Sequence, residues 1–142
     1  MVQTVEKGVS ANMKGEIGKK DIYTEKAAFT GGPYSQAVIH GDLIYVSGQI
    51  ALDPDTNEPA LGTIEQEATL ALHNLRIILE EAGSSMDKVL KVTVYLASMD
   101  DYPRFNEVYK GFFSPELPAR TCIAAAALPL GAKVEVDAIA YL

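Results

Sequence analysis

Arg120 and Glu135 stand out because each is a charged residue within an otherwise apolar segment near the end of the chain. Arg120 lies in "ARTCIAAAA", and Glu135 lies between two valines in "KVEVDAIAYL". A guanidinium group binds a carboxylate through two parallel hydrogen bonds, and a carboxylate in a partly dry site orients or deprotonates water. Together these groups suit the hydrolysis of a small electrophile that carries a carboxylate. The same pair is also typical of a structural ion pair.

The two segments, residues 120–126 and 133–141, are predicted to be strands that pair as a hairpin. In the expected register Arg120, Cys122 and Glu135 lie on one face of the sheet. Arg120 and Glu135 would then stand roughly 13 Å apart along the ladder, and the arginine side chain would close about half of that gap. The expected pocket has room for a molecule of a few carbons.

Length and composition limit the possible classes of protein. A chain of 142 residues with 48% hydrophobic residues fits one soluble domain with a real core. The net charge of -7 argues against a nucleic-acid groove, which needs a basic face. Cys122 is the single cysteine, which excludes an intrachain disulfide and a multi-cysteine zinc site and suits a reducing compartment. No apolar run approaches the roughly 20 residues of a membrane span.

The first half of the domain is predicted to hold a hairpin and a long helix. Residues 35–39 and 43–50 are rich in β-formers and flank the turn "HGD". A helix is expected from Thr63, which forms a capping box with Gln66, to a stop at Gly83. One apolar stripe follows its period: Ile64, Ala68, Ala71, Leu72, Leu75, Ile78, Leu79 and Ala82. Its acids are expected on the solvated face: Glu65, Glu67, Glu80 and Glu81.

The second half is predicted to add a strand in "KVLKVTVYLAS" and a helix that starts at Asp100–Asp101. The order is then β-β-α-β-α-β-β, an α/β (α+β) domain with a mixed sheet and both helices on one face. The other face has apolar side chains that need cover, so we expect a homo-oligomer. Residues 23–142 form the domain, and residues 1–22 form an extension, either a mobile tail or an added edge strand.

Four motifs in order, "GGPYSQAV", "IYVSGQIAL", "FNEVYKGFF" and "LPARTCIAAAALPLGAKVEVDAIA", make the sequence resemble the Rid family of reactive intermediate deaminases. The resemblance runs from Ile22 to Leu142 and is strongest to the RidA branch, the 2-iminobutanoate/2-iminopropanoate deaminases. It implies a chorismate-mutase-like fold and a homotrimer with substrate sites between subunits. This is compatible with the element order and the uncovered sheet face inferred above.

The resemblance also implies roles for residues of the last motif. The family's carboxylate-binding arginine falls on Arg120, and its neighbouring cysteine falls on Cys122. The glutamate that positions water falls on Glu135. A lone cysteine with no neighbouring histidine is more typical of a small hydrophobic side chain than of a nucleophile, so Cys122 is expected to line the pocket and to offer its backbone to the substrate.

Three further positions follow from the resemblance. Tyr34 matches the pocket tyrosine, Gly48 the glycine of the S-G-Q motif, and Asn106 the helix asparagine. Tyr34 is expected to donate its hydroxyl to the substrate or to water, and the alternative is a packed aromatic after a proline turn. From the residues alone Gly48 is equally a bulge or a point of close backbone approach. Asn106 is expected at a subunit interface or in solvent.

The reaction implied is the hydrolysis of 2-imino acids, or their enamine tautomers, to 2-oxo acids and ammonia, in protection of pyridoxal-phosphate enzymes. No cofactor or metal is required, since the imine is already electrophilic. A cytoplasmic location is expected, and targeting by the N-terminal extension stays open. The alternatives are a non-enzymatic trimer that binds small carboxylates or acts as a chaperone and, against the acidic charge, a ribonuclease that inhibits translation.

Overall fold

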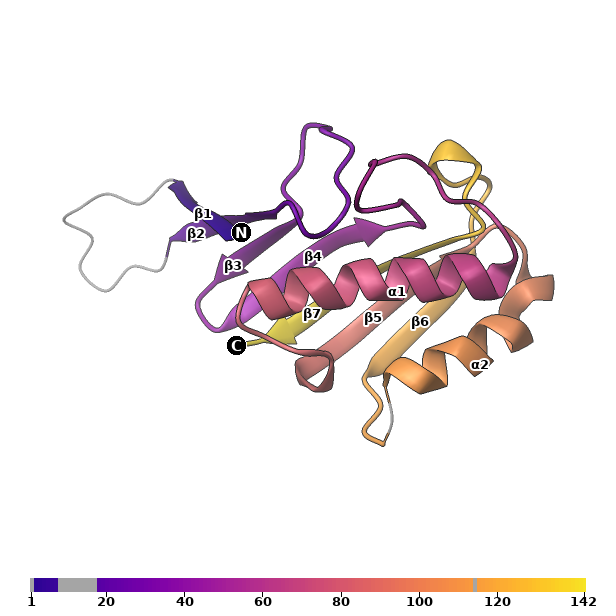
Figure 1. Ribbon diagram of the computed structural model, residues 1–142. Coiled ribbons are helices and arrows are strands. Elements are labelled where there is room, and N and C mark those ends of the chain that lie inside the picture. Colours follow the sequence, from indigo (N-terminus) through magenta and orange to yellow (C-terminus); the bar gives the residue numbers. More distant parts are fainter. Residues whose placement is uncertain (1, 8–17, 114) are drawn as a thin grey trace.

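In the described residues of the computed structural model, seven strands form one mixed sheet, and two α-helices pack on one of its faces (Figure 1). The structure describes residues 2–7, 18–113 and 115–142. The strand order across the sheet is β1-β2-β3-β4-β7-β5-β6. The predicted α+β class with both helices on the same face is confirmed. The strands are β1 Val2–Lys7, β2 Lys19–Thr24, β3 Ala37–His40, β4 Leu43–Gln49, β5 Val89–Leu96, β6 Ala119–Ala124 and β7 Val134–Tyr141.

The N-terminal strands β1 and β2 pair antiparallel at one edge of the sheet, and β2 continues the sheet onto β3. Ile22 of β2 is 2% exposed and belongs to the main core. The sheet therefore begins before Tyr23, where the ordered domain was expected to start. Residues 1 and 8–17 of the predicted extension lie outside the described residues.

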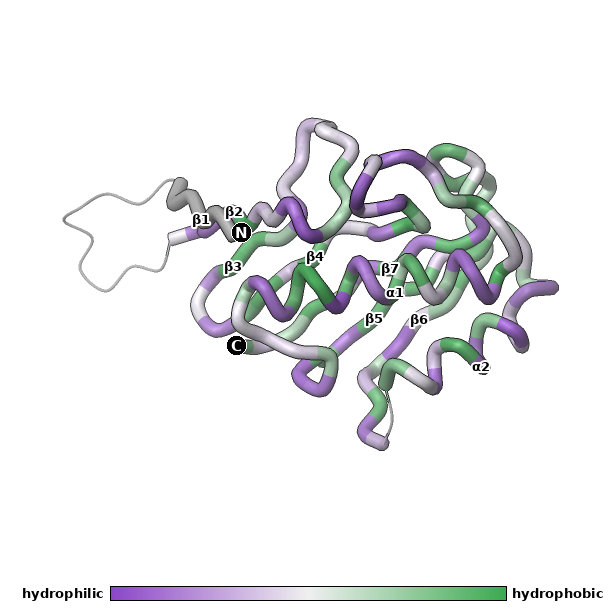
Figure 2. The backbone as a smooth tube through the Cα atoms, in the orientation of Figure 1, coloured by the Kyte–Doolittle hydropathy of each residue, from purple (hydrophilic) through white to green (hydrophobic). Residues whose placement is uncertain are grey.

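Helix α1, Ile64–Glu81, forms as its local sequence predicts. The Thr63 side chain accepts the backbone N–H of Gln66, and the Gln66 side chain accepts the backbone N–H of Thr63, so the capping box is present. Gly83 has φ +92° just past the end, a conformation that costs glycine little. Figure 2 shows hydrophobic and hydrophilic residues alternating along α1, as a helix with one buried face requires.

Helix α2, Tyr102–Phe112, follows the short 3-10 helix Met99–Asp101, close to the predicted start. It buries Phe105, Tyr109 and the following Phe113 against the sheet and α1. No helix in the described part of the chain has the length and apolarity needed to cross a membrane.

The two closing strands do not form the predicted hairpin. β6 pairs parallel with β5, and β7 lies between β4 and β5, antiparallel to both. The physical reason is the crossover: α2 connects β5 to β6, and a strand–helix–strand unit places its strands parallel and side by side. β6 thus occupies one edge of β5, and the chain passes through residues 125–133 to pair β7 along the other edge.

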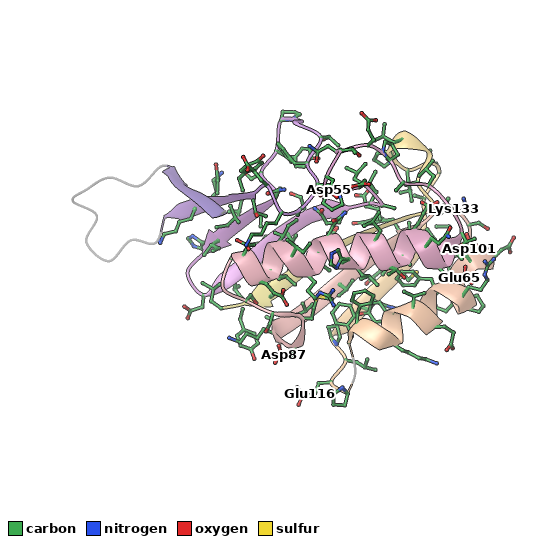
Figure 3. All side chains as sticks on the ribbon, viewed as in Figure 1. Asp55, Glu65, Asp87, Asp101, Glu116 and Lys133 are labelled. Atoms are coloured by element: carbon green, nitrogen blue, oxygen red, sulfur yellow. The ribbon has the colours of Figure 1, made fainter. Side chains whose placement is uncertain are left out.

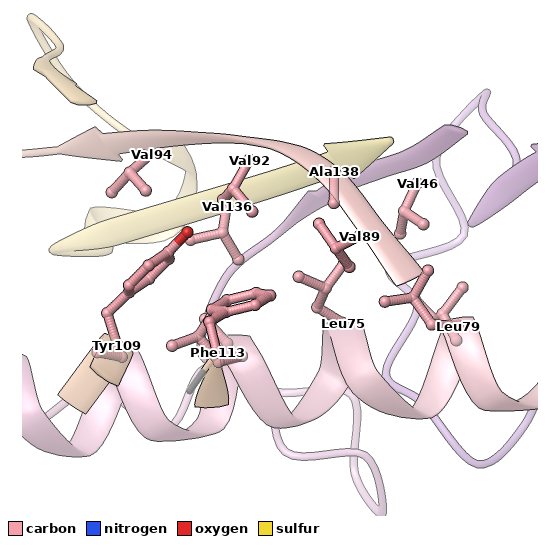
Figure 4. Packing of buried hydrophobic residues seen from close by; sticks show 14 of the residues in the cluster. Val46, Leu75, Leu79, Val89, Val92, Val94, Tyr109, Phe113, Val136 and Ala138 are labelled. Atoms are coloured by element: carbon pink, nitrogen blue, oxygen red, sulfur yellow. The ribbon is translucent and has the colours of Figure 1, made fainter. Parts of the chain in front are cut away.

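The side-chain alternation predicted within β7 is correct and defines the two faces of the sheet. Its helix-facing residues are buried: Val134, Val136, Ala138 and Ala140. Figure 4 shows Leu75 and Leu79 of α1 packed toward this face, and each fully buried side chain of this kind contributes about 2 kcal/mol. The opposite face exposes large apolar side chains, including Tyr45, Ile123 and Tyr141.

Candidate active site

Arg120 projects from β6 to the helix side of the sheet, where α2 fixes its guanidinium. Arg120 Nη1 donates to Asn106 Oδ1 at 2.9 Å, and Nη2 donates to the Tyr102 hydroxyl at 3.1 Å. The guanidinium carbon lies 4.7 Å from the centre of the Tyr109 ring. Arginine has five N–H donors, so three remain for another molecule. Within the described part of the chain, both hydrogen-bond partners of this cation are neutral.

An open cavity of about 510 Å³ lies beside Arg120 and is also lined by Asn106, Tyr109 and Leu117. We call it the arginine cavity. Cys122 lies two residues further along β6, on the same side of the strand as Arg120. Burial raises the pKa of the Cys122 thiol, and the charge of Arg120 offsets only part of that rise. A thiol that stays protonated supports a structural role rather than a nucleophilic one.

Glu135 projects from β7 to the opposite side of the sheet, against the backbone of Gly48. A methyl group on Gly48 would lie 2.8 Å from Glu135 Cδ and 3.1 Å from Cγ, closer than ordinary contact allows. Gly48 therefore provides the space in which the carboxylate rests. Burial, and secondarily the charge of Asp137, raises the pKa of Glu135. This shift favours proton exchange nearer to neutral pH.

A second cavity, of about 540 Å³, contains Tyr34, Gly48 and Glu135 in its lining. We call it the glutamate cavity. Tyr34 is 46% exposed; its hydroxyl lies 2.8 Å from the Thr30 hydroxyl, and its ring meets Phe29 edge-on at 5.2 Å. The structure thus brings together three of the predicted site residues here.

The loop that carries Tyr34 is held from within by the buried side chain of Gln36. Its Oε1 accepts the backbone N–H of Thr24, and its Nε2 donates to the carbonyls of Thr24, Ala27 and Ala28. A buried amide with several partners is costly to displace, so Gln36 fixes the entrance to the glutamate cavity.

Glu67 fixes the start of β7, although the sequence placed it on the solvated face of α1. It is fully buried, and its carboxylate accepts the backbone N–H groups of Lys133 at 2.9 Å and Gly62 at 3.1 Å. The Lys133 carbonyl accepts the N–H of Ala97. Figure 3 shows Lys133 near the N-terminal end of α1. The chain is therefore clamped two residues before Glu135.

The prediction that Arg120, Cys122 and Glu135 share one face is wrong. In the observed register Arg120 aligns with Val92 and Ala138, which face the helices. Glu135 aligns with Tyr95 on the other face. Arg120 and Glu135 therefore neither form an ion pair nor line one cavity within a single copy of the chain.

Sequence reasoning missed Tyr102 and Tyr109, which support Arg120, and Asp137, which acts on Glu135. Tyr102, Asn106 and Tyr109 are spaced four and three residues apart, so they lie on one side of α2. That spacing around Asn106 was a usable signal. Asp137 accepts a hydrogen bond from Tyr95 at 3.1 Å, and its pKa is raised by burial.

The described residues contain no cluster of three or more metal-ligating side chains.

Comparison with known proteins shows the family. Residues 24–142 match the family described as endoribonuclease L-PSP. A mouse protein named 2-iminobutanoate/2-iminopropanoate deaminase is 48% identical over 87% of this chain and 92% of its own length. The crystal structure of a putative endoribonuclease L-PSP from Entamoeba histolytica has a TM-score of 0.84 and 48% identity, and covers 87% of this chain and 99% of that one.

A further structure, E. coli TdcF with bound serine, has a TM-score of 0.81 and 37% identity, and covers 86% of this chain and 98% of that one. Sequence and fold therefore agree with the resemblance that the motifs indicated. The chain belongs to the endoribonuclease L-PSP family, the Rid family of deaminases.

Proposed function

We propose that this protein hydrolyses small 2-imino acids, such as 2-iminobutanoate and 2-iminopropanoate, to 2-oxo acids and ammonia. The observation that carries this proposal is Arg120, a cation held in an open cavity by the neutral partners Asn106 and Tyr102. A pre-oriented guanidinium with free donors is suited to a carboxylate. The deaminase name of the mouse relative supports the reaction, and the serine bound to E. coli TdcF supports a ligand of this size and charge.

We further propose that each site is shared between two copies of the chain, in the homotrimer that the family resemblance implies. Arg120 and Glu135 lie on opposite faces of the sheet, so one substrate can reach both groups only where two copies meet. The exposed Tyr45, Ile123 and Tyr141 give the face that carries Glu135 apolar surface for such a contact.

In the proposed mechanism, Arg120 of one copy binds the substrate carboxylate through two hydrogen bonds. Glu135 of the neighbouring copy accepts a proton from a water molecule as the water oxygen attacks the C=N carbon. That proton passes to nitrogen, and the hydroxyl proton follows it through Glu135 as the C=O bond forms, the C–N bond breaks and ammonia leaves. Tyr34 is placed to hydrogen-bond the substrate or the water, and the edge-strand backbone at Cys122 offers further contacts.

The direct test generates 2-iminobutanoate from threonine with a pyridoxal-phosphate dehydratase in the presence of semicarbazide. The active protein diverts imine from the semicarbazone to 2-oxobutanoate. Arg120→Ala should lose most of this activity, because a charged bidentate contact is lost. If the wild-type protein does not accelerate hydrolysis, or if Arg120→Ala equals it, the proposed function is wrong. Protection of pyridoxal-phosphate enzymes would follow from removal of the reactive imine.

A complementation experiment tests whether the site is shared. Arg120→Ala and Glu135→Gln are each expected to be inactive alone. When the two variants are unfolded and refolded together, about one quarter of the sites should regain both groups by random mixing. Refolded mixtures that stay as inactive as the separate variants would show that the two residues do not meet across copies.

Two other functions make different predictions. A binding module would bind 2-oxobutanoate in calorimetry without turnover. The family description favours RNA cleavage, but a net charge of -7 opposes the binding of phosphate backbones. RNA cleavage that persists through repurification and disappears in Arg120→Ala would favour the ribonuclease.

A further inference from the structure

Asp137 is a half-buried carboxylate that the proposed mechanism does not use. It follows Glu135 by two residues on β7, so the two side chains lie on the same face of the sheet, roughly 7 Å apart along the strand. Burial raises the pKa of both carboxyls. Two carboxylates at this separation repel each other when both are ionised, so the protonation of one depends on the charge of the other.

Tyr95 connects these two carboxylates. It stands directly opposite Glu135 in the antiparallel pairing of β5 with β7, where opposed Cβ atoms are about 5 Å apart. Its hydroxyl donates diagonally to Asp137 Oδ2 at 3.1 Å. The ring therefore lies along the flank of Glu135, and the hydroxyl ends at Asp137. Burial, followed by the charge and the hydrogen bond of Asp137, raises the pKa of the Tyr95 phenol, so it remains a donor at neutral pH.

The two carboxylates differ in the hydrogen bonds that they accept. Burial raises the pKa of Asp137, and hydrogen bonds from Tyr95 and from the opposed Thr93 side chain lower it in part. Glu135 accepts no side-chain hydrogen bond from the described residues, and the charge of Asp137 adds to the effect of burial on its pKa. When the pair holds one proton, that proton is therefore expected on Glu135, while Asp137 stays ionised.

The other ionisable groups near this pair belong to the neighbouring strands and one loop. On β5, Lys91 faces the same side, and its Nζ donates to Thr121 Oγ1 of β6 at 3.0 Å. On β4 the ionisable group is Tyr45, and in the loop before β3 it is Tyr34. Within the described residues, no lysine or arginine forms an ion pair with either carboxylate. In the proposed shared site, the neighbour's Arg120 adds a charge that the substrate carboxylate neutralises.

We propose that Tyr95 and Asp137 are positioning residues for the reaction: the Tyr95 hydroxyl keeps Asp137 ionised, and the charge of Asp137 makes Glu135 a stronger proton acceptor. The inference rests on the proposed function, in which Glu135 accepts a proton from water. Glu135 contacts the reactants, and Tyr95 and Asp137 act through it. A base whose proton affinity is matched to the working pH accelerates proton transfer, so the two residues contribute to the rate without touching the substrate.

The test is the pH–rate profile of kcat/KM for 2-iminobutanoate, with the generating dehydratase kept in excess at each pH. One charge about 7 Å away changes the ionisation equilibrium of a carboxyl about tenfold at an effective dielectric constant of ~40. At acidic pH, Asp137→Asn should therefore raise kcat/KM about tenfold, and Tyr95→Phe, which removes only the hydrogen bond, about threefold. On the plateau at higher pH both should be slower than wild type, Asp137→Asn by about threefold, because the base is weaker.

The double variant shows whether Tyr95 acts through Asp137. If it does, Tyr95→Phe changes nothing further in the Asp137→Asn background. Tyr23→Phe is the matched control, because it removes a phenol hydroxyl on β2, and β3 and β4 lie between β2 and β7. Its profile should equal that of wild type.

Two results would overturn the inference and leave the proposed function standing. One is a loss of kcat/KM by the same factor at every pH in Tyr95→Phe and Asp137→Asn, which indicates a structural role. The other is a double variant in which the two effects add. A wild-type protein that does not hydrolyse the imine at any pH would overturn both the inference and the proposed function.

Discussion

The close approach of Gly48 and Glu135 yields the sharpest prediction, for the substitution Gly48→Ala. The added methyl would lie 2.8 Å from Glu135 Cδ, whereas ordinary contacts begin at 3.4 Å. The carboxyl carbon must therefore move by at least 3.4 − 2.8 = 0.6 Å, and the nearer Oε2 must move further. A displacement of about 1 Å at a reacting group costs about a hundredfold in rate. We expect kcat to fall by about that factor.

The same substitution should leave substrate affinity and stability nearly unchanged. In the proposed shared site, Arg120 of the other copy binds the carboxylate of the substrate, so KM should change little. Gly48 does not adopt a positive φ, and the displaced group is the end of a half-buried side chain that can rotate. Loss of glycine flexibility in the unfolded chain adds about 0.4–1 kcal/mol of stability, which offsets the crowding.

Gly111→Ala provides the matched control. Gly111 lies in α2, and a methyl group there meets no atom within 4 Å. This variant should keep wild-type kcat and gain about 0.5–1 kcal/mol of stability, since alanine favours a helix over glycine. kcat and KM come from the semicarbazide assay, and Tm from circular dichroism. A folded Gly48→Ala protein with wild-type kcat would refute the role of the Glu135 position in the reaction.

Three further predictions follow from the environments of single side chains. In the pH–rate profile, kcat/KM should fall as the pH drops through the raised pKa of Glu135. Asp137→Asn should move this fall to lower pH, because the substitution removes a charge that raises the pKa of Glu135. A carboxyl whose pKa is raised in the folded state stabilises the fold when protonated and loses that contribution as the pH rises through that pKa. Glutamine stays neutral, so Glu135→Gln should raise Tm at pH 7 but not below pH ~4. Thermal melts at both pH values test this. Tyr109→Phe should stabilise the fold by about 1 kcal/mol in urea unfolding, since the buried Tyr109 hydroxyl has no hydrogen-bond partner among the described residues.

The elements that local sequence determines were predicted well. The period of α1, its capping box at Thr63 and its stop at Gly83 are all properties of neighbouring residues, and all three are present. The alternation within β7 was also correct, because side-chain direction along one strand follows from the pleat alone. The two-residue turn at Gly41 that joins β3 to β4 belongs to the same class of local signals.

The choice of partner for each strand could not be obtained from local signals. Residues 125–133 are too many for a tight hairpin turn, and that length was the available warning against pairing β6 with β7. The motifs identified the site residues. The face of the sheet on which each residue lies depends on how the strands that carry them are paired. Glu67 illustrates the same limit, because its burial comes from the distant Lys133 and not from its place on α1.

The separation of Arg120 from Glu135 has a chemical advantage that the predicted arrangement lacks. An arginine and a glutamate side by side in one pocket would form an ion pair, which lowers the pKa of the carboxyl and occupies the donors that a substrate needs. On opposite faces, Arg120 keeps three donors free on neutral partners, and burial raises the pKa of Glu135 instead. In the proposed shared site, a small anion between two copies satisfies the cation while the carboxylate stays available to water. Variants that prevent a second copy from binding the Glu135 face are therefore expected to lose assembly and activity together.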